Sequence, residues 1–298
     1  MTPPHPPTFA SPRTVVCDVA AYAWVRAPLE SLPELRRNPG PGFDAPLPVG
    51  ALKQADEQTV AAVAAVAHAA HSYGLAPVSF RSWAVLAAPY YMGRPAMAAA
   101  VGRYLTEGAW GASPHLPPHR SLHSPSGTIS QLFKMHGPNY GVGGGPGCAA
   151  EILTAAAAVI DDGRVPGVWA TLTALDPDLP PDRAGAAAPG TACAALALAL
   201  IPVQSALGSR VRLSIAGPAV PLPPATSDSA PALDLFTLKD ALDALFRSPD
   251  SDRSAFVLPL EAGGRLEIAR TDCSAPDGRS PARAASLLAP IPLAEAEW

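Results

Sequence analysis

Cys148 is the residue with the clearest chemical potential in this sequence. It lies in the stretch GPNYGVGGGPGCAAEIL, residues 137–153, where a glycine-rich run leads into an alanine-rich segment with helical spacing. A cysteine in the first turn of a helix is either a nucleophile, which needs a base such as His136 or His123 beside it, or a small buried residue. Both interpretations stay open at this level.

A phosphate cradle is the other chemistry that a glycine run suggests. The dinucleotide fingerprint requires three glycines in the pattern G-x-G-x-x-G. A frame that starts at Gly141 puts Pro146 at the third glycine, and one that starts at Gly143 puts Cys148 there. Neither frame fits, so we expect no nucleotide cofactor at this turn.

Histidines at four-residue spacing are a further candidate, for a metal site. His115, His119 and His123 would line one face of a helix. Because Pro117, Pro118 and Pro125 interrupt that segment, we expect residues 111–127 to form a solvated loop instead. His68 and His71 lie one helical turn apart with no acidic or thiol partner nearby, which favours a surface or packed pair. The sequence therefore predicts no metal ligands.

The segments around this stretch alternate between strand and helix patterns. We expect strands at residues 13–25, 82–88, 167–175, 191–203 and 210–217, and helices at residues 54–74, 94–105, 128–136 and 147–162. The strand at 191–203 is apolar on both faces, which is typical of a central position in a sheet. This order predicts an α/β protein with a largely covered, mixed sheet.

The last third of the chain begins with a proline-rich segment, residues 218–231, which we interpret as a linker. An amphipathic helix at residues 233–248 and a β-hairpin at 255–270, turning near Gly263 and Gly264, follow it. We therefore divide the chain into residues 1–217 and an abbreviated C-terminal part, residues 218–298.

Composition excludes several classes of protein. The formal net charge is −4 and no basic cluster occurs, which argues against nucleic acid as a partner. The four cysteines, at 17, 148, 193 and 273, form no CxxC pair, which fits reduced thiols and a cytoplasmic location. The N-terminus lacks the apolar core of a secretion signal, and prolines and a glycine interrupt the longest uncharged run, residues 184–208, so we expect no membrane span.

The frame GPNYGVGGGPGCAAEILTAAAAVIDDGRVPGVWATL resembles the N-terminal half of a β-ketoacyl synthase, a family with the thiolase-like fold. The segments HSPSGTISQLFKMH before it and DRAGAAAPGTACAALALALIPV after it extend the resemblance. The family motif places Gly-Pro-Asn before a buried strand and a nucleophilic cysteine in a tight turn at a helix N-terminus. There the helix dipole and the unpaired N–H groups lower the thiol pKa and hold an acyl oxyanion.

The alignment of this stretch with the family motif determines which residue takes the position of the nucleophile. Counting from Gly137 places the family's nucleophile at Pro146, and Cys148 lies two residues further on. Proline suits the first turn of a helix but carries no nucleophile. We call the four residues Gly145, Pro146, Gly147 and Cys148 the nucleophile turn.

The family's two catalytic histidines follow the cysteine in sequence, whereas all seven histidines here precede Cys148, at 5, 68, 71, 115, 119, 123 and 136. The resemblance thus implies a chain-length-factor-like subunit of fatty-acid or polyketide-type biosynthesis that does not itself condense acyl chains. Its implied partners are an active ketosynthase and an acyl carrier protein, in a homo- or heterodimer. The alternatives are an acyltransferase that uses Cys148, with His136 or His123, and a scaffold unrelated to acyl chemistry.

Overall fold

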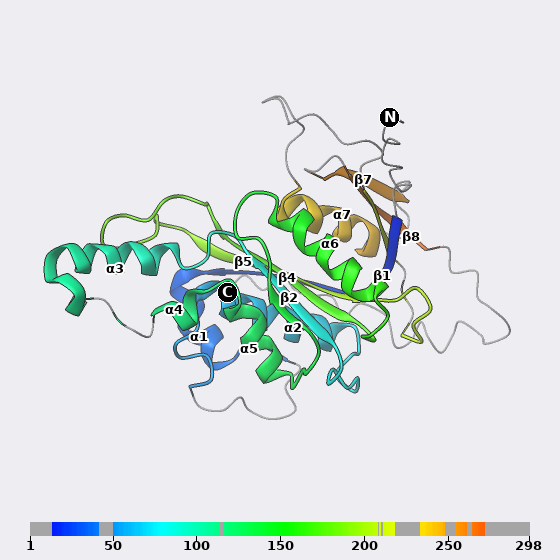
Figure 1. Cartoon of the computed structure of the whole chain (residues 1–298), viewed down its shortest axis with the longest axis horizontal. Coiled ribbons are helices and arrows are strands. Elements are labelled where there is room, and N and C mark those ends of the chain that lie inside the picture. Colours follow the sequence, from blue (N-terminus) through cyan, green and yellow to red (C-terminus); the bar gives the residue numbers. More distant parts are fainter. Residues whose placement is uncertain are drawn as a thin grey trace, which may run out of the picture.

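The computed structural model describes residues 14–41, 50–111, 113, 116–207, 209, 211–217, 233–247, 254–260 and 264–271. One mixed sheet of eight strands forms the centre of the molecule, with helices on both faces (Figure 1). The strand order is β3-β2-β4-β5-β1-β6-β8-β7. Strands β3, β2 and β4 are parallel, and every other neighbouring pair is antiparallel.

The strands are β1 (Thr14–Pro28), β2 (Ala84–Pro89), β3 (Asn139–Gly141), β4 (Val168–Asp176), β5 (Ala192–Ile201), β6 (Val211–Ala216), β7 (Ala255–Pro259) and β8 (Arg265–Arg270). The helices are α1 (Leu32–Arg37), α2 (Glu57–Ser72), α3 (Arg94–Glu107), α4 (Leu116–Arg120), α5 (Ser124–Leu132), α6 (Cys148–Asp161) and α7 (Leu235–Arg247), with short 3-10 helices η1 (Leu29–Ser31) and η2 (Gly108–Gly111). The α/β class and the helix-covered mixed sheet expected from the sequence are confirmed.

Strand β5 is buried along its whole length, between β4 and β1, which confirms the central position expected for it. Its two faces differ in size. Leu196, Leu198 and Leu200 point into the core that α6 and α7 cover, whereas the alternating alanines, such as Ala197, belong to the core under α2. The sequence therefore assigns a bulky face and a small face to one strand.

Helix α2 fits the small face because it is itself built from alanine and valine. Twelve of its 16 residues are buried, and small side chains on both partners allow its backbone to lie close to the sheet. Asp56 caps its first turn by accepting from the Gln58 N–H, at 3.0 Å. Gly74, just beyond its end, has φ +65°, which matches the C-terminal cap expected there.

The C-terminal hairpin extends the same sheet. Strand β8 pairs antiparallel with β6, β7 forms the edge beyond it, and α7 packs on the face that carries α6. The linker expected at residues 218–231 lies outside the described residues. The division of the chain at residue 217 stays a prediction.

The expected loop at residues 111–127 is wrong in part. Residues 116–120 form α4, and α5 begins at Ser124. Pro117 and Pro118 lie in the first turn of α4, and Pro125 lies in the first turn of α5. A missing N–H there removes no helical hydrogen bond, so proline is compatible with both helices.

Among the described residues, none of the helices combines the length and the apolar character that crossing a membrane requires.

Candidate functional site

The candidate site lies at the carboxyl ends of the parallel strands β2, β3 and β4. Strand β3 is a short, half-buried edge strand rather than the buried strand that the resemblance implies. The chain leaves it at Gly141, passes through the glycine run and enters α6 at Cys148. The carboxyl ends of parallel strands are where open α/β sheets commonly place ligands.

Three glycines shape this connection. Gly143, Gly144 and Gly147 have φ values of +68°, +124° and +80°, which side chains rarely adopt. A Cβ at Gly143 would lie 2.7 Å from the Cβ of Cys148 and 2.7 Å from Oε2 of Glu151. The glycine run is therefore needed for chain geometry, independent of any ligand.

Hydrogen bonds fix the connection to β2. The Val142 N–H donates to the Ala87 carbonyl at 2.8 Å, and the Tyr91 N–H donates to the Gly144 carbonyl at 2.9 Å. Within the turn, the Cys148 N–H donates to the Gly145 carbonyl at 3.2 Å. The nucleophile turn is thus a defined loop.

Pro146 lies outside the helix, two residues before its first residue, rather than in its first turn. The N-cap of α6 is Gly147, in a left-handed conformation, and Pro146 precedes it on the exposed side of the turn. Gly147 has a positive φ, which is not a helical conformation. The helix therefore begins at Cys148, one residue after the expected start at Gly147. The ring at position 146 offers no group that could form a covalent intermediate.

Cys148 is the first residue of α6 and is 8% exposed. Its side chain belongs to the core on the α6 face of the sheet, and Tyr90 lies near enough for its phenol pKa to respond to the thiol. Burial, then Tyr91, are the larger causes of the raised pKa of Tyr90. The position at a helix N-terminus could stabilise a thiolate, but little of the residue is open to a substrate.

His136 and Cys148 lie at opposite ends of β2. The His136 N–H donates to the Arg81 carbonyl, before the strand begins, whereas the turn is bonded to Tyr91, after it ends. The six residues of β2 between them correspond to roughly 20 Å at about 3.3 Å per residue. His136 does not lie beside the thiol.

His123 lies at the same end of the sheet as the turn, because the Leu122–His123 backbone packs against Gly141. Its ring is directed toward α5: Nδ1 lies 3.3 Å from the Ser126 hydroxyl. The structure therefore brings the backbone of His123, but not an identified base, to the region of Cys148.

The other histidines expected to be non-functional are found in structural settings. His68 packs against Gly40, and burial followed by His71 lowers its pKa. His119 lies in the last turn of α4, and His115 lies outside the described residues. Within the described ranges, no group of three or more His, Cys, Asp or Glu side chains is placed to hold a metal ion.

Two further thiols are deeply buried. Cys17 in β1 and Cys193 in β5 are free cysteines with no exposed area. Burial, assisted by Asp18, raises the pKa of Cys17 to about 12, and burial also raises that of Cys193. Both remain protonated near neutral pH and behave as small apolar residues.

A buried polar network that the sequence did not reveal supports the turn from the other face of the sheet. The Gln58 side chain donates to the Tyr90 carbonyl at 2.9 Å and accepts from the Thr173 hydroxyl at 2.7 Å. It thereby connects α2 to the ends of β2 and β4. Since Tyr91 binds Gly144, this network positions the nucleophile turn indirectly.

Asp56 adds a buried charge to the same region. Its carboxylate lies 3.1 Å from Nε of Arg120 on α4 and is 2% exposed as a residue. Burial, followed by the neighbouring Glu57, raises the pKa of Asp56 to about 7, against the opposing effect of Arg120. The acidic residues at the start of α2, Asp56 and Glu57, can be recognised in the sequence, but the contact of Asp56 with Arg120 of α4 cannot.

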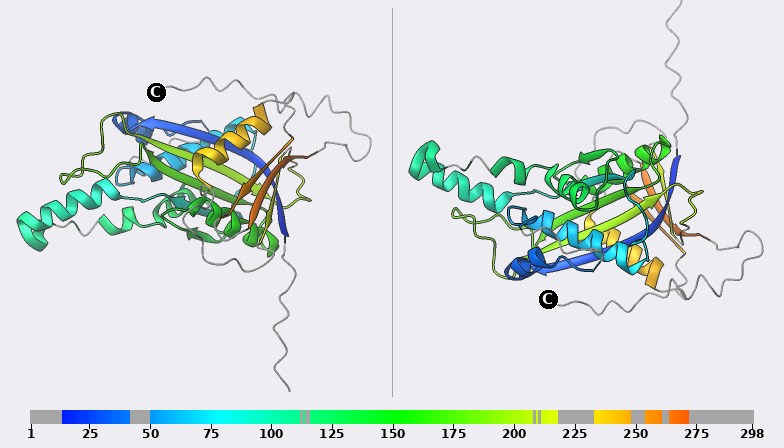
Figure 2. Two further views of the ribbon diagram at one scale, coloured as in Figure 1. Left: turned by 90° about the horizontal axis from the view of Figure 1, so that it is seen from above. Right: turned by 90° about the horizontal axis from the view of Figure 1, so that it is seen from below.

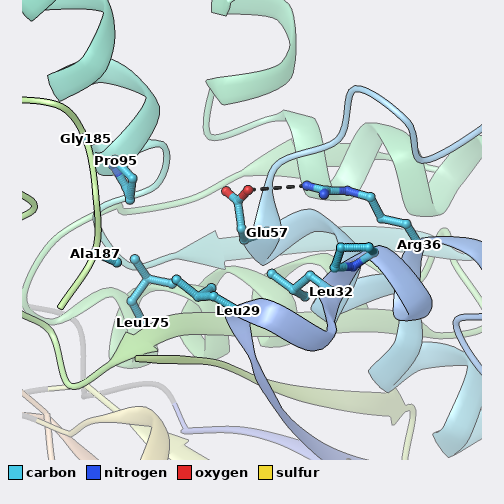
Figure 3. Close-up of a pocket in the computed structure, with 9 residues that line it drawn as sticks. Leu29, Leu32, Arg36, Glu57, Pro95, Leu175, Gly185 and Ala187 are labelled. Atoms are coloured by element: carbon cyan, nitrogen blue, oxygen red, sulfur yellow. Dashed lines mark hydrogen bonds and ion pairs between the residues drawn. The ribbon is translucent and has the colours of Figure 1, made fainter. Parts of the chain in front are cut away.

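A cavity of about 230 Å³ opens on the α2 side, where η1, α1 and the beginning of α3 meet (Figure 3). Leu29, Leu32 and Leu175 form apolar walls, and the Arg36–Glu57 ion pair, 3.3 Å long, lies on one side. None of the four residues of the nucleophile turn lines it. Because its walls come from segments far apart in the chain, no local pattern could have predicted it.

The architecture is that of the ketosynthases, a thiolase-like fold. A solved structure of a ketosynthase in complex with its chain length factor, from Xenorhabdus doucetiae, matches with a TM-score of 0.50 and 14% identity, covering 86% of this chain and 100% of the matched chain. At this level of identity the likeness establishes the fold alone. No model of a protein family matches the sequence, and no curated protein matches it.

Two other solved structures are similar over a smaller part of their length. A β-ketoacyl synthase from Burkholderia phymatum STM815 has a TM-score of 0.45 and 13% identity, covering 64% of this chain and 59% of the matched chain. The ishigamide ketosynthase/chain length factor has a TM-score of 0.45 and 14% identity, covering 67% and 65%. This chain spans less than two thirds of each.

Proposed function

We propose that this chain is a non-condensing, chain-length-factor-like subunit that acts beside an active ketosynthase in fatty-acid or polyketide-type biosynthesis. In this role the polypeptide supplies part of a shared assembly, and acyl transfer takes place on the nucleophile of the partner. The observation that carries the proposal is the hydrogen-bonded nucleophile turn, in which Pro146 occupies the position where the resemblance places the family's cysteine.

The surroundings of the nucleophile turn support the proposal that Cys148 does not act as a nucleophile. Cys148 is mostly buried, His136 lies at the far end of β2, and the His123 ring is directed toward Ser126. A cysteine nucleophile usually needs a base within hydrogen-bond reach. In addition, all seven histidines of the printed sequence precede Cys148, whereas the resemblance implies two that follow the cysteine.

The retained geometry supports a structural role for the same region. Hydrogen bonds to β2, the three left-handed glycines and the Gln58 network all maintain a turn that carries no reactive group at position 146. The similar Xenorhabdus structure is, by its description, a ketosynthase with its chain length factor. We therefore propose a ketosynthase as the partner and, from the resemblance to the β-ketoacyl synthases, an acyl carrier protein as well.

Reconstitution tests this proposal. The chain is co-expressed with a ketosynthase and an acyl carrier protein, and chain elongation is followed by mass spectrometry of the carrier-bound product. We expect elongation to require both proteins, to continue with Cys148→Ala in this chain, and to stop when the nucleophile of the ketosynthase is replaced. Elongation by the ketosynthase alone, with the same products, would contradict the proposed role.

The alternative is an acyltransferase that uses Cys148, and one observation favours it: the residue begins a helix whose N-cap, Gly147, has no side chain to bind the first amide groups. In the same assay this alternative predicts that Cys148→Ala abolishes product formation even when the ketosynthase is intact. The two functions are thus separated by a single substitution.

A further inference from the structure

The cavity of about 230 Å³ beside α1 and α3 has the composition of a small-molecule site (Figure 3). Seven of its nine lining residues are apolar or glycine, and the other two are the charged residues Arg36 and Glu57. Ligand sites are typically concave and mostly apolar, with a few polar groups that fix the orientation of the ligand. In all three views, α1, α3 and the loop of residues 177–191 lie at one end of the sheet, away from β7 and β8 (Figures 1 and 2).

The loop that forms one wall of the cavity is held in a defined conformation. Asp182 Oδ1 accepts from the N–H groups of Ala184 and Ala186, at 2.9 and 2.8 Å. Between them, Gly185 has φ +84°, and a Cβ at this position would clash with the Pro95 carbonyl oxygen of α3. The loop therefore lies directly against the start of α3, and this wall of the cavity is in place without a ligand.

The polar wall is fixed as well. Arg36 Nη2 donates to the Ala55 carbonyl at 2.9 Å and to Oε1 of Glu57 at 3.3 Å. Among the described residues, none accepts a hydrogen bond from Nη1 of Arg36. The Arg36 and Glu57 side chains are 24% and 29% exposed, so both keep atoms open to the cavity. The wall thus offers N–H donors and a carboxylate acceptor side by side.

The ion pair selects the charge of a ligand. A carboxylate placed beside it would be attracted by Arg36 but repelled by Glu57, and an ammonium group would experience the reverse. Either charged group would lose its hydration without a net electrostatic gain. An uncharged carboxamide matches both residues, because its carbonyl oxygen accepts from Arg36 while its N–H donates to Glu57.

The volume sets the size of a ligand. A cavity of about 150 Å³ holds one benzene molecule, so 230 Å³ holds roughly nine non-hydrogen atoms. The carbon, oxygen and nitrogen of a carboxamide leave about six carbon atoms for an apolar body. Leu29, Leu32 and Leu175 lie below the ion pair in Figure 3, where they can cover such a body.

We propose that this cavity binds a small uncharged molecule with a carboxamide head and an apolar body of about six carbon atoms. The head bonds to Arg36 and Glu57, and the body packs against the three leucines. The inference goes beyond the proposed function, because no residue of the nucleophile turn lines the cavity and binding requires no ketosynthase.

A ligand-observed NMR titration of the purified full chain tests the chemical class. Benzamide, benzoate and benzylamine are the probes, because they share one apolar ring and differ in the charge of the head. We expect a dissociation constant of about 1 mM or tighter for benzamide, and values at least about tenfold higher for the two charged probes. No saturable binding of benzamide, or a charged probe that binds as tightly, would overturn the proposal.

Filling the cavity tests the location. Ala187→Phe adds a ring to the loop wall and should weaken benzamide binding at least about tenfold. Ala186→Phe is the matched control, because Ala186 is an exposed neighbour that does not line the cavity, and it should leave the affinity unchanged. Circular dichroism verifies that both variants are folded. Equal affinities in the two variants would place the binding elsewhere.

Glu57→Gln tests the role of the ion pair without filling the cavity. Arg36 keeps its hydrogen bond to the Ala55 carbonyl in this variant, while the repulsion of an anion is removed. Benzoate binding should become at least about tenfold tighter, and benzamide binding should change by less than about threefold. An unchanged affinity for benzoate would show that the head does not lie beside Glu57 and would contradict the proposal.

Discussion

Pro146 and Cys148 are the two residues on which the proposed loss of a nucleophile in this turn depends. The count from Gly137, together with the resemblance, predicts proline at the nucleophile position. The structure adds that Pro146 precedes the N-cap and that Cys148, the first helical residue, is mostly buried. Gly143 approaches Cys148 from within the same glycine run, and Tyr90 packs against the same core from the end of β2, a contact that residue spacing alone does not predict.

Gly143 provides a direct test of the geometry of the turn. Gly143→Ala should destabilise the protein by roughly 1–3 kcal/mol, because φ is +68° and the added Cβ would meet the Cys148 side chain. Gly145→Ala is the matched control: its Cβ would have an ordinary contact of 3.9 Å with Tyr91, so little change is expected. Denaturant titration measures both, and equal losses would contradict the geometry.

Asp56 predicts a pH dependence of stability. Its pKa is raised to about 7 from an ordinary 3.8, so the folded protein holds this proton more tightly than the unfolded chain does. Stability from this group is therefore present at low pH and is lost as the pH rises from about 4 through about 7.

Urea unfolding at about pH 5 and about pH 8 measures this effect. Asp56→Asn, which keeps the helix cap, should remove this part of the pH dependence. A variant that retains the full difference between the two pH values would show that the dependence comes from other groups.

At the scale of elements, the helices and strands with the clearest local sequence patterns were the ones predicted correctly. Helix α2 was predictable because acidic residues mark its start, Gly74 marks its end and small apolar residues fill the space between. Strand β5 was predictable from its uninterrupted apolar run. Helices α4 and α5 were less predictable, because Pro117, Pro118 and Pro125 end a helix when they lie in its interior but are compatible with its first turn.

The Gln58 network is an element-scale feature with no local signal, since it connects α2, β2 and β4. Gln58→Leu should lower the free energy of unfolding by about 1–3 kcal/mol, because the Tyr90 carbonyl and the Thr173 hydroxyl would lose their partner. Gln131→Leu, at an exposed position of α5, serves as the control and should change stability by less than about 0.5 kcal/mol. Similar values for the two variants would contradict a supporting role of the network.

At the scale of the whole molecule, the thiolase-like fold was predictable from the resemblance, whereas the arrangement of the last segments was not. The hairpin β7–β8 was expected from local spacing, but its place in the sheet, where β8 pairs with β6, was not. Pairing between strands that are distant in sequence depends on long-range contacts, which local spacing does not encode. The projecting helix α3 was likewise expected as a helix, but its exposed apolar face became apparent only in three dimensions.

The whole-molecule account rests on the claim that this thiolase-like chain does not form an acyl-enzyme intermediate. Intact-mass spectrometry after incubation with acyl and malonyl carrier protein tests that claim most directly, with an active ketosynthase as the positive control. We predict an unmodified mass for this chain and an acyl adduct on the ketosynthase. An adduct on this chain that disappears in Cys148→Ala would contradict the account.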